Sequence, residues 1–222
     1  MSAYEVKRID EFDAIPIEEH NMTWRPIRRT LGITAFGINA YTGDTGRQVV
    51  EEHHENYLQH EEVYIVLIGR ARFTLGEEEV VAGPGTIVYL RDPGTKRGAV
   101  ALEDGTTVLA VGGKPGEAYT PSPWEWSFAA RPLRDRGDLE GALAIVREGL
   151  KATDHAFLSY DVAAYETLLG RGQDALVNLR RAVEVEPRTA AWARDDEDFA
   201  SLKDHPEFLA ITGQPESGGA GA

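Results

Sequence analysis

The first half of the chain carries short apolar runs, each a few residues long and rich in β-branched and aromatic side chains. Glycine, proline and aspartate separate the runs at turn-sized intervals, which is typical of antiparallel strands. The pattern predicts an antiparallel barrel or sandwich in this part of the chain. The clearest runs are residues 33–41, 63–68, 71–75, 86–90 and 106–111.

Beyond Asp138 the spacing of apolar residues changes to that of helices. Positions i, i+4, i+7 and i+11 are apolar, and they line one face of a helix. We expect Asp138 to cap the first helix, Asp154 to cap the second and Pro187 to end the third. No long helical period appears before Pro132. The stripes are formed by Leu139, Leu143, Val146 and Leu150, then by Leu158, Val162, Tyr165 and Leu169, and finally by Leu176, Leu179 and Val183.

An internal repeat relates two of these helices. The pair Ala142-Leu143 recurs 33 residues later as Ala175-Leu176. A helix–turn–helix period near about 34 residues is the signature of tetratricopeptide repeats (TPR), so the segment resembles a short TPR array. The stretch 192–211 resembles the cap that closes such arrays. An array this short buries its faces poorly alone, which implies docking on the barrel or on a partner.

The change of period sets the expected domain boundaries. Pro121 and Pro123 interrupt regular structure. We interpret the adjacent Trp124 and Trp126 as packing residues at the junction or on the barrel exterior. The sequence therefore predicts a β-domain over residues 1–130, an all-α domain over 131–213 and a disordered tail over 214–222.

Composition narrows the class of protein. With 42% hydrophobic and 27% charged residues, the chain is globular in character. No apolar stretch approaches the roughly 20 residues that span a bilayer, and the N-terminus does not have the pattern of a signal peptide. The absence of cysteine excludes disulfides and thiolate chemistry, and a formal charge of −14 argues against nucleic-acid and anionic membrane partners. We expect a soluble cytoplasmic protein.

The candidate chemistry lies between His53 and Arg97. Glu62 is followed, after six intervening residues, by Gly69, and a glycine-led apolar strand runs through the Pro93-Gly94 turn to Arg97. On these motifs residues 30–115 resemble the cupin superfamily. The resemblance implies a small jelly-roll barrel with its site inside. In metal-binding members, histidines and a glutamate hold a divalent ion such as iron, manganese, nickel or zinc.

Two departures from that family pattern bear on metal binding. Arg97 stands where the last histidine ligand is expected, and a guanidinium has no lone pair for a metal. The histidines before Glu62 also have unusual spacing, and the acidic run 51–55 around them is typical of a solvated loop. The remaining candidate ligands are His54, His60 and Glu62.

Period-two alternation places His60, Glu62 and Tyr64 on one strand face. The resemblance implies that Glu62 points into the barrel and that Arg97 enters from a neighbouring strand. Two interpretations follow. In the first, Glu62 and Arg97 form a buried ion pair that has no role in binding or catalysis. In the second, Arg97 binds the carboxylate or phosphate of a ligand, with Glu62, Tyr64 and His60 beside it.

Three functions stay open, and the sequence does not decide whether the protein is an enzyme. The first is a barrel that binds a small polar or anionic organic molecule. The second is a metal-dependent oxygenase or isomerase, and the third is a TPR-like scaffold with an inert barrel. The resemblance implies a homodimer, and the helical domain would contact a protein partner.

Overall fold

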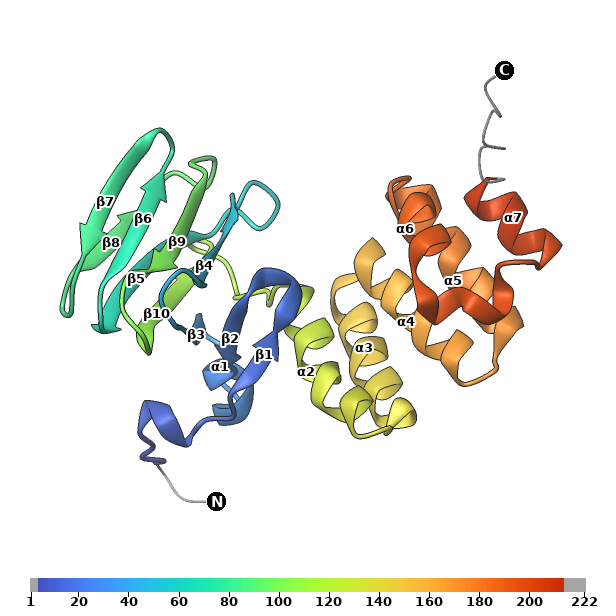
Figure 1. Cartoon of the computed structure of the whole chain (residues 1–222), viewed down its shortest axis with the longest axis horizontal. Helices are drawn as coiled ribbons and strands as arrows, with labels where there is room; N and C mark the ends of the chain where they lie inside the picture. Colours follow the sequence, from blue (N-terminus) through green and yellow to red (C-terminus); the bar gives the residue numbers. More distant parts are fainter. Residues whose placement is uncertain (1–3, 214–222) are drawn as a thin grey trace. The chain divides into compact units, whose positions relative to one another are not determined.

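The chain divides into two compact units, Met1–Ser122 and Pro123–Ala222, and the computed structural model describes residues 4–213 (Figure 1). Each unit has its own apolar core. The tail expected at 214–222 lies outside the described residues. Within the described range, no helix combines the length and the apolar character needed to cross a membrane.

The first unit consists mainly of strands (blue to green in Figure 1). A short helix, α1 (Ile27–Leu31), and two 3-10 turns, Ile9–Glu11 and Glu18–His20, accompany them. The strands are β1 (Ile15–Ile17), β2 (Met22–Arg25), β3 (Gly37–Gly43), β4 (Gln48–His53), β5 (Glu61–Ile68), β6 (Ala71–Leu75), β7 (Glu78–Ala82), β8 (Ile87–Leu90), β9 (Arg97–Ala101) and β10 (Thr106–Gly113).

These strands form two antiparallel sheets, with orders β1-β2-β3-β10-β5-β8 and β4-β9-β6-β7. One apolar cluster draws residues from both sheets, including Val66 on β5, Phe73 on β6 and Val108 on β10, all fully buried. Alternation along each strand puts such residues inside and their neighbours outside. The sheets therefore pack face to face around a shared core.

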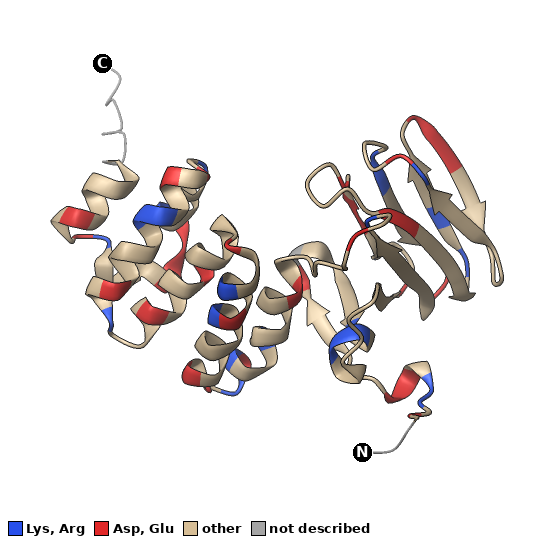
Figure 2. Cartoon of the chain, turned by 180° about the vertical axis from the view of Figure 1, so that it is seen from behind, with Lys and Arg blue, Asp and Glu red and all other residues tan. Residues whose placement is uncertain are grey.

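The antiparallel β-domain expected from the apolar runs is confirmed. The run 71–75 coincides with β6, and the run 106–111 lies within β10. Strands β1, β2, β4, β7 and β9 were not among the expected runs. The first two are only 3 and 4 residues long, and acidic, small or basic residues interrupt the apolar positions of the other three. Acidic residues on β7 (red in Figure 2) have a structural role: Glu78 and Glu79 are exposed on a sheet edge, where charge opposes pairing with another chain.

The second unit is built from helices (Figure 1). A 3-10 segment, Glu197–Leu202, interrupts the series near its end. The helices are α2 (Trp124–Asp135), α3 (Leu139–Thr153), α4 (Ala156–Leu168), α5 (Gly172–Val185), α6 (Thr189–Asp195) and α7 (Pro206–Thr212).

Of the two expected helix caps, one is observed and the other is not. Asp138 caps α3 as expected, its carboxylate accepting from the backbone of Gly141 at 2.9 Å. The expectation that Asp154 caps α4 is wrong. Asp154 ends α3 in the left-handed conformation (φ 55°), which aspartate tolerates better than most residues. The imidazole of His155 caps α4 instead.

Helix α2 was not expected, because the sequence shows no long helical period before Pro132. The proline lies inside α2, where it removes one backbone hydrogen bond near the end of the helix. Packing compensates for that loss. Trp126 is buried in the core of the helical unit, and a Cβ built on Gly149 would lie 2.5 Å from its Cγ atom. Close approach of α2 to α3 thus depends on a glycine.

Candidate functional site

Arg97 is fully buried at the start of β9. Its Nε atom lies 3.2 Å from Glu62 Oε2, and its Nη1 donates to the Pro93 carbonyl at 3.1 Å. The contact with Glu62 is an ion pair outside hydrogen-bonding geometry, and among the described residues Nη2 has no hydrogen-bond partner. The Glu62–Arg97 pair expected from the sequence is therefore present, with part of the guanidinium unsatisfied.

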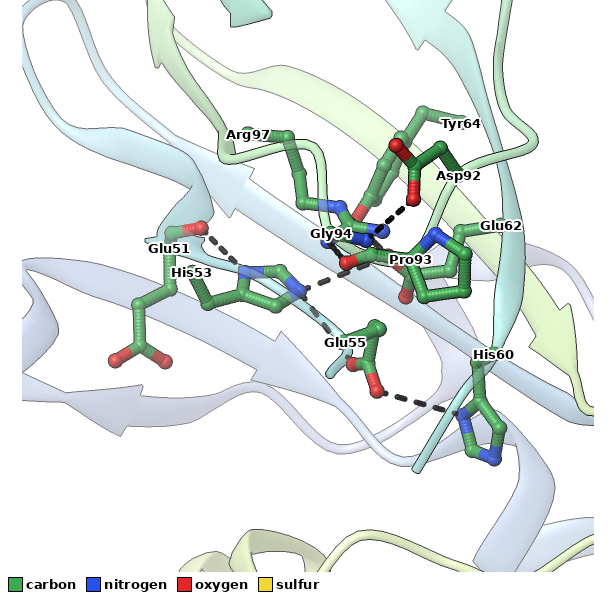
Figure 3. A network of polar contacts seen from close by, with 10 residues as sticks. All are labelled: Glu51, His53, Glu55, His60, Glu62, Tyr64, Asp92, Pro93, Gly94 and Arg97. Carbon is green, nitrogen blue, oxygen red and sulfur yellow. Dashed lines mark hydrogen bonds and ion pairs between the residues drawn. The ribbon is translucent and has the colours of Figure 1, made fainter. Parts of the chain in front are cut away.

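Glu62 is the centre of the polar contacts (Figure 3). Besides Arg97, its Oε2 atom accepts from the Tyr64 hydroxyl at 2.6 Å and lies 3.6 Å from His53 Nε2. Burial raises the pKa of Glu62, but His53, Tyr64 and Arg97 together lower it below its ordinary value. Burial and the adjacent Glu62 raise the pKa of Tyr64 well above 10. Glu62 is thus a carboxylate and Tyr64 a neutral donor.

His53 lies directly opposite Arg97 in the β4–β9 ladder. Its Nδ1 is 2.7 Å from the carbonyl of Glu51, which can only accept, so Nδ1 carries a proton and Nε2 faces the site. Burial lowers the pKa of His53, but Glu62, the Glu51 carbonyl and Glu55 outweigh it and raise the pKa overall. The imidazole therefore tends toward the cationic form beside Glu62.

Glu55 brings a second carboxylate to the same place. Its Oε1 atom lies 3.6 Å from His53 Nε2 and its Oε2 atom 3.8 Å from His60 Nδ1. Burial and the charge of Glu62 raise the pKa of Glu55 to about 7, against the opposing charges of His53 and Arg97. Two nearby carboxylates cannot both ionise freely. Near neutral pH, Glu62 therefore carries a full negative charge, whereas Glu55 is ionised in only part of the molecules.

A backbone contact fixes the segment that carries Glu55. The Pro93 carbonyl, which accepts from Arg97, also accepts from the Glu55 backbone N–H at 2.8 Å. In the same turn, Gly94 donates to Asp92 at 2.8 Å (Figure 3). One turn thus positions both Arg97 and Glu55.

The remaining sequence candidates fall on either side of the site. His60 is buried, its pKa lowered by that burial, and it stacks on Tyr119 with ring centroids 5.3 Å apart. His54 is exposed and does not belong to the cluster. Lys96, the basic residue next to Arg97, is exposed and pairs with Glu52.

His53 and Glu55 were missed because the acidic run around them was interpreted as a solvated loop. Residues Gln48–His53 instead form β4, whose last side chain faces Arg97. The available signal was the β-branched pair Val49 and Val50 just before the acidic residues, since both are buried and belong to the same strand.

One group of side chains among the described residues has the arrangement of a metal site. His53, Glu55 and Glu62 each offer a ligand atom, and these atoms lie within 4.8 Å of one another. One imidazole and two carboxylates suit a divalent metal such as zinc, iron or manganese. The set fits a metal by donor type, while the Arg97 charge beside Glu62 opposes a second cation. It differs from the expected set by replacing His54 and His60 with His53 and Glu55.

No protein-family model matches the chain, and no curated protein matches its sequence. Solved structures do resemble its N-terminal half. KdgF from Halomonas sp. is 20% identical over 50% of this chain and 92% of that chain, with a TM-score of 0.39. A cupin 2 conserved barrel domain protein from Salinispora arenicola is 20% identical over 51% and 92%, with a TM-score of 0.42.

A sugar phosphate isomerase from a cupin superfamily, from Silicibacter pomeroyi, is 15% identical over 54% of this chain and 83% of that chain, with a TM-score of 0.42. These neighbours are cupin-superfamily proteins. Similarity at this level carries no argument about activity.

Proposed function

We propose that the N-terminal unit binds a small organic molecule through an anionic group held by Arg97. The observation that carries this proposal is the buried Nη2 atom of Arg97, which has no hydrogen-bond partner among the described residues. Leaving a buried charged donor unsatisfied is costly. A carboxylate or phosphate would satisfy it with a charge-assisted bond in the geometry that guanidinium favours.

The charges around Arg97 support an anionic ligand rather than a cationic one. Glu62 balances the positive charge of Arg97. The raised pKa of His53 favours its protonated form, which adds a second positive side chain to the site. Glu55 is only partly ionised near neutral pH because its pKa is about 7. Arg97 and a protonated His53 carry two positive charges against the full charge of Glu62 and the partial charge of Glu55, so the group has a net positive charge that favours an anionic ligand.

Thermal unfolding in the presence of organic acids and phosphates tests this function. We expect at least one acid to raise the melting temperature of the full chain and the increase to be lost in Arg97→Lys, which keeps the charge but not the planar fork. Arg72→Lys is the matched control, since Arg72 is exposed on β6. No increase across the whole panel would refute the proposal.

A metal-dependent enzyme, an oxygenase or isomerase, is the second candidate because His53, Glu55 and Glu62 converge. A divalent ion held there would polarise an oxygen atom of the substrate. Elemental analysis distinguishes this candidate: stoichiometric metal should disappear in His53→Ala and persist in His54→Ala, its exposed neighbour. Metal-free protein, or equal loss in both variants, would count against it.

For the second unit we propose the TPR-like role inferred from its repeat. Ala142 and Ala175, which are related by the repeat, are both fully buried where helices pack. Such a unit would serve as a contact surface for a protein partner. If the barrel binds no ligand, the protein would act as a TPR-like scaffold with an inert barrel.

A further inference from the structure

Two glycines lie side by side next to Glu62. Gly112 on β10 is directly opposite Glu62 on β5, and on its other side it is directly opposite Gly37 on β3. Directly opposite residues of antiparallel strands place their side chains on the same face. Beside Glu62, the inner face of this sheet therefore has two neighbouring positions without a side chain.

Other groups use the space that these glycines leave. A Cβ built on Gly112 would lie 3.1 Å from Glu62 Cγ, so the Glu62 side chain lies across this glycine. A Cβ built on Gly37 would lie 2.5 Å from the hydroxyl oxygen of Tyr119. The Tyr119 phenol thus reaches the same sheet face as Glu62, although its residue belongs to an irregular segment after β10.

Tyr119 is joined to the candidate site by a second contact. Its ring stacks on the buried His60, whose Nδ1 lies 3.8 Å from Glu55 Oε2. Glu55 in turn reaches His53, and His53 reaches Glu62, which pairs with Arg97. The site therefore has three zones: a cation at Arg97, two carboxylates in the middle, and an aromatic pair at Tyr119 and His60.

We propose that Tyr119 is a ligand-contact residue that selects acids carried on a hydroxylated ring. The inference rests on the proposed function, because the acid group would bind Arg97. An ionised carboxylate only accepts hydrogen bonds, so Glu62 favours a ligand with hydroxyl donors. The flat face of a ring packs against an aromatic side chain with more contact than an open chain does. Together, the three zones match a cyclic polyhydroxy acid.

Calorimetric titration of the full chain with four probes tests each zone. D-Glucuronate has the ring, the hydroxyls and the acid, whereas D-gluconate has the hydroxyls and the acid on an open chain. Cyclohexanecarboxylate has the ring and the acid without hydroxyls, and acetate has the acid alone. We expect D-glucuronate to bind most tightly, and Arg97→Lys to weaken every probe that binds.

The Tyr119→Leu variant should weaken D-glucuronate about tenfold, the size of a lost aromatic contact, and change D-gluconate by less than about twofold. Gly37→Ala should act in the same direction, since its new methyl group displaces the Tyr119 hydroxyl. These two substitutions lie on different segments, so a folding defect in one leaves the other as a test. Tyr89→Leu, on the outer face of β8, is the matched control.

Two outcomes separate the inference from the function on which it rests. If acids bind and Arg97→Lys weakens them, but Tyr119→Leu and Gly37→Ala affect ring and open-chain acids equally or not at all, the role of Tyr119 is wrong and the proposed function stands. If no acid binds, or Arg97→Lys changes nothing, both are wrong.

Discussion

His53 on β4 and Arg97 on β9 occupy directly opposite positions in one sheet, and Glu62 from the other sheet contacts both. The site is thus assembled across the interior of the β-domain, from β4 and β9 of one sheet and β5 of the other. Two basic side chains share one carboxylate, and a second carboxylate, Glu55, lies alongside. The charge of each group depends on the others.

Breaking the Glu62–Arg97 pair on one side should be far more harmful than replacing both partners. Arg97→Ala leaves Glu62 buried without its guanidinium, and we expect a loss of about 3–5 kcal/mol in the free energy of unfolding. The double variant Arg97→Met with Glu62→Gln should recover at least half of that loss, because no uncompensated charge remains. Urea unfolding measures both values. Equal losses in the two variants would contradict the pairing.

Asp161 in the helical unit should make stability depend on pH. Burial raises its pKa from 3.8 to about 6, against a hydrogen bond from Ser127 and the charge of Arg131. The folded state therefore binds this proton more tightly than the unfolded state. The contribution of Asp161 to stability is fully present below about pH 4 and is lost as the pH rises to about 6.

The variant Asp161→Asn isolates this dependence. It should match the parent near pH 4 and exceed it in stability above about pH 6, because asparagine has no charge to bury. Urea unfolding across this pH range provides the comparison, with the exposed Asp204→Asn as control. The interpretation fails if Asp161→Asn and the parent differ by the same amount at every pH.

Gly149 should tolerate no side chain. A methyl group there would meet Trp126 at 2.5 Å, and both helices are held in one core. We expect Gly149→Ala to cost on the order of 1–3 kcal/mol despite the better helix propensity of alanine. Gly172→Ala is the control, because its nearest neighbour is the flexible end of Leu202 at 3.1 Å. Similar stability of the two variants would show that Gly149 and Trp126 do not pack closely between α2 and α3.

The outer face of β5 and β8 should mediate self-association. Ile87 is 64% exposed and Tyr89 46%, with Leu67 beside them. An apolar patch of this kind on a sheet face marks an interaction surface, and the homodimer that the cupin resemblance implies would bury it. We expect a dimer in sedimentation experiments and a monomer for Ile87→Lys. Val81→Lys, exposed on β7, should leave the dimer intact. A parent chain that sediments as a monomer at all concentrations would refute this prediction.

Much of the fold was predictable because local patterns and tertiary packing agree. The run 71–75 alternates cleanly and forms β6, and Asp138 has a single favourable role at a helix start. Asp154 could cap either neighbouring helix, and only tertiary context placed it at the end of α3. In α2, the buried Trp126 outweighs the local effect of Pro132.

The site was predictable only where strand geometry relates residues close in sequence. Glu62 and Tyr64 share a face by alternation, and their contact follows from it. The spacing of the histidines did not distinguish His53 from His54, whereas strand pairing places His53 opposite Arg97. Tyr119 gave no signal, since it reaches the site through a glycine on a distant strand.

The most direct test of the central claim observes the Arg97 guanidinium itself. Nitrogen-15 NMR of arginine side chains, with the Arg97 signal assigned from Arg97→Lys, reports the Nη atoms during titration with D-glucuronate. We predict that the Arg97 Nη resonances shift and saturate while those of the exposed Arg72 do not move. Arg97 resonances that stay unchanged as a bound acid saturates the protein would contradict the account.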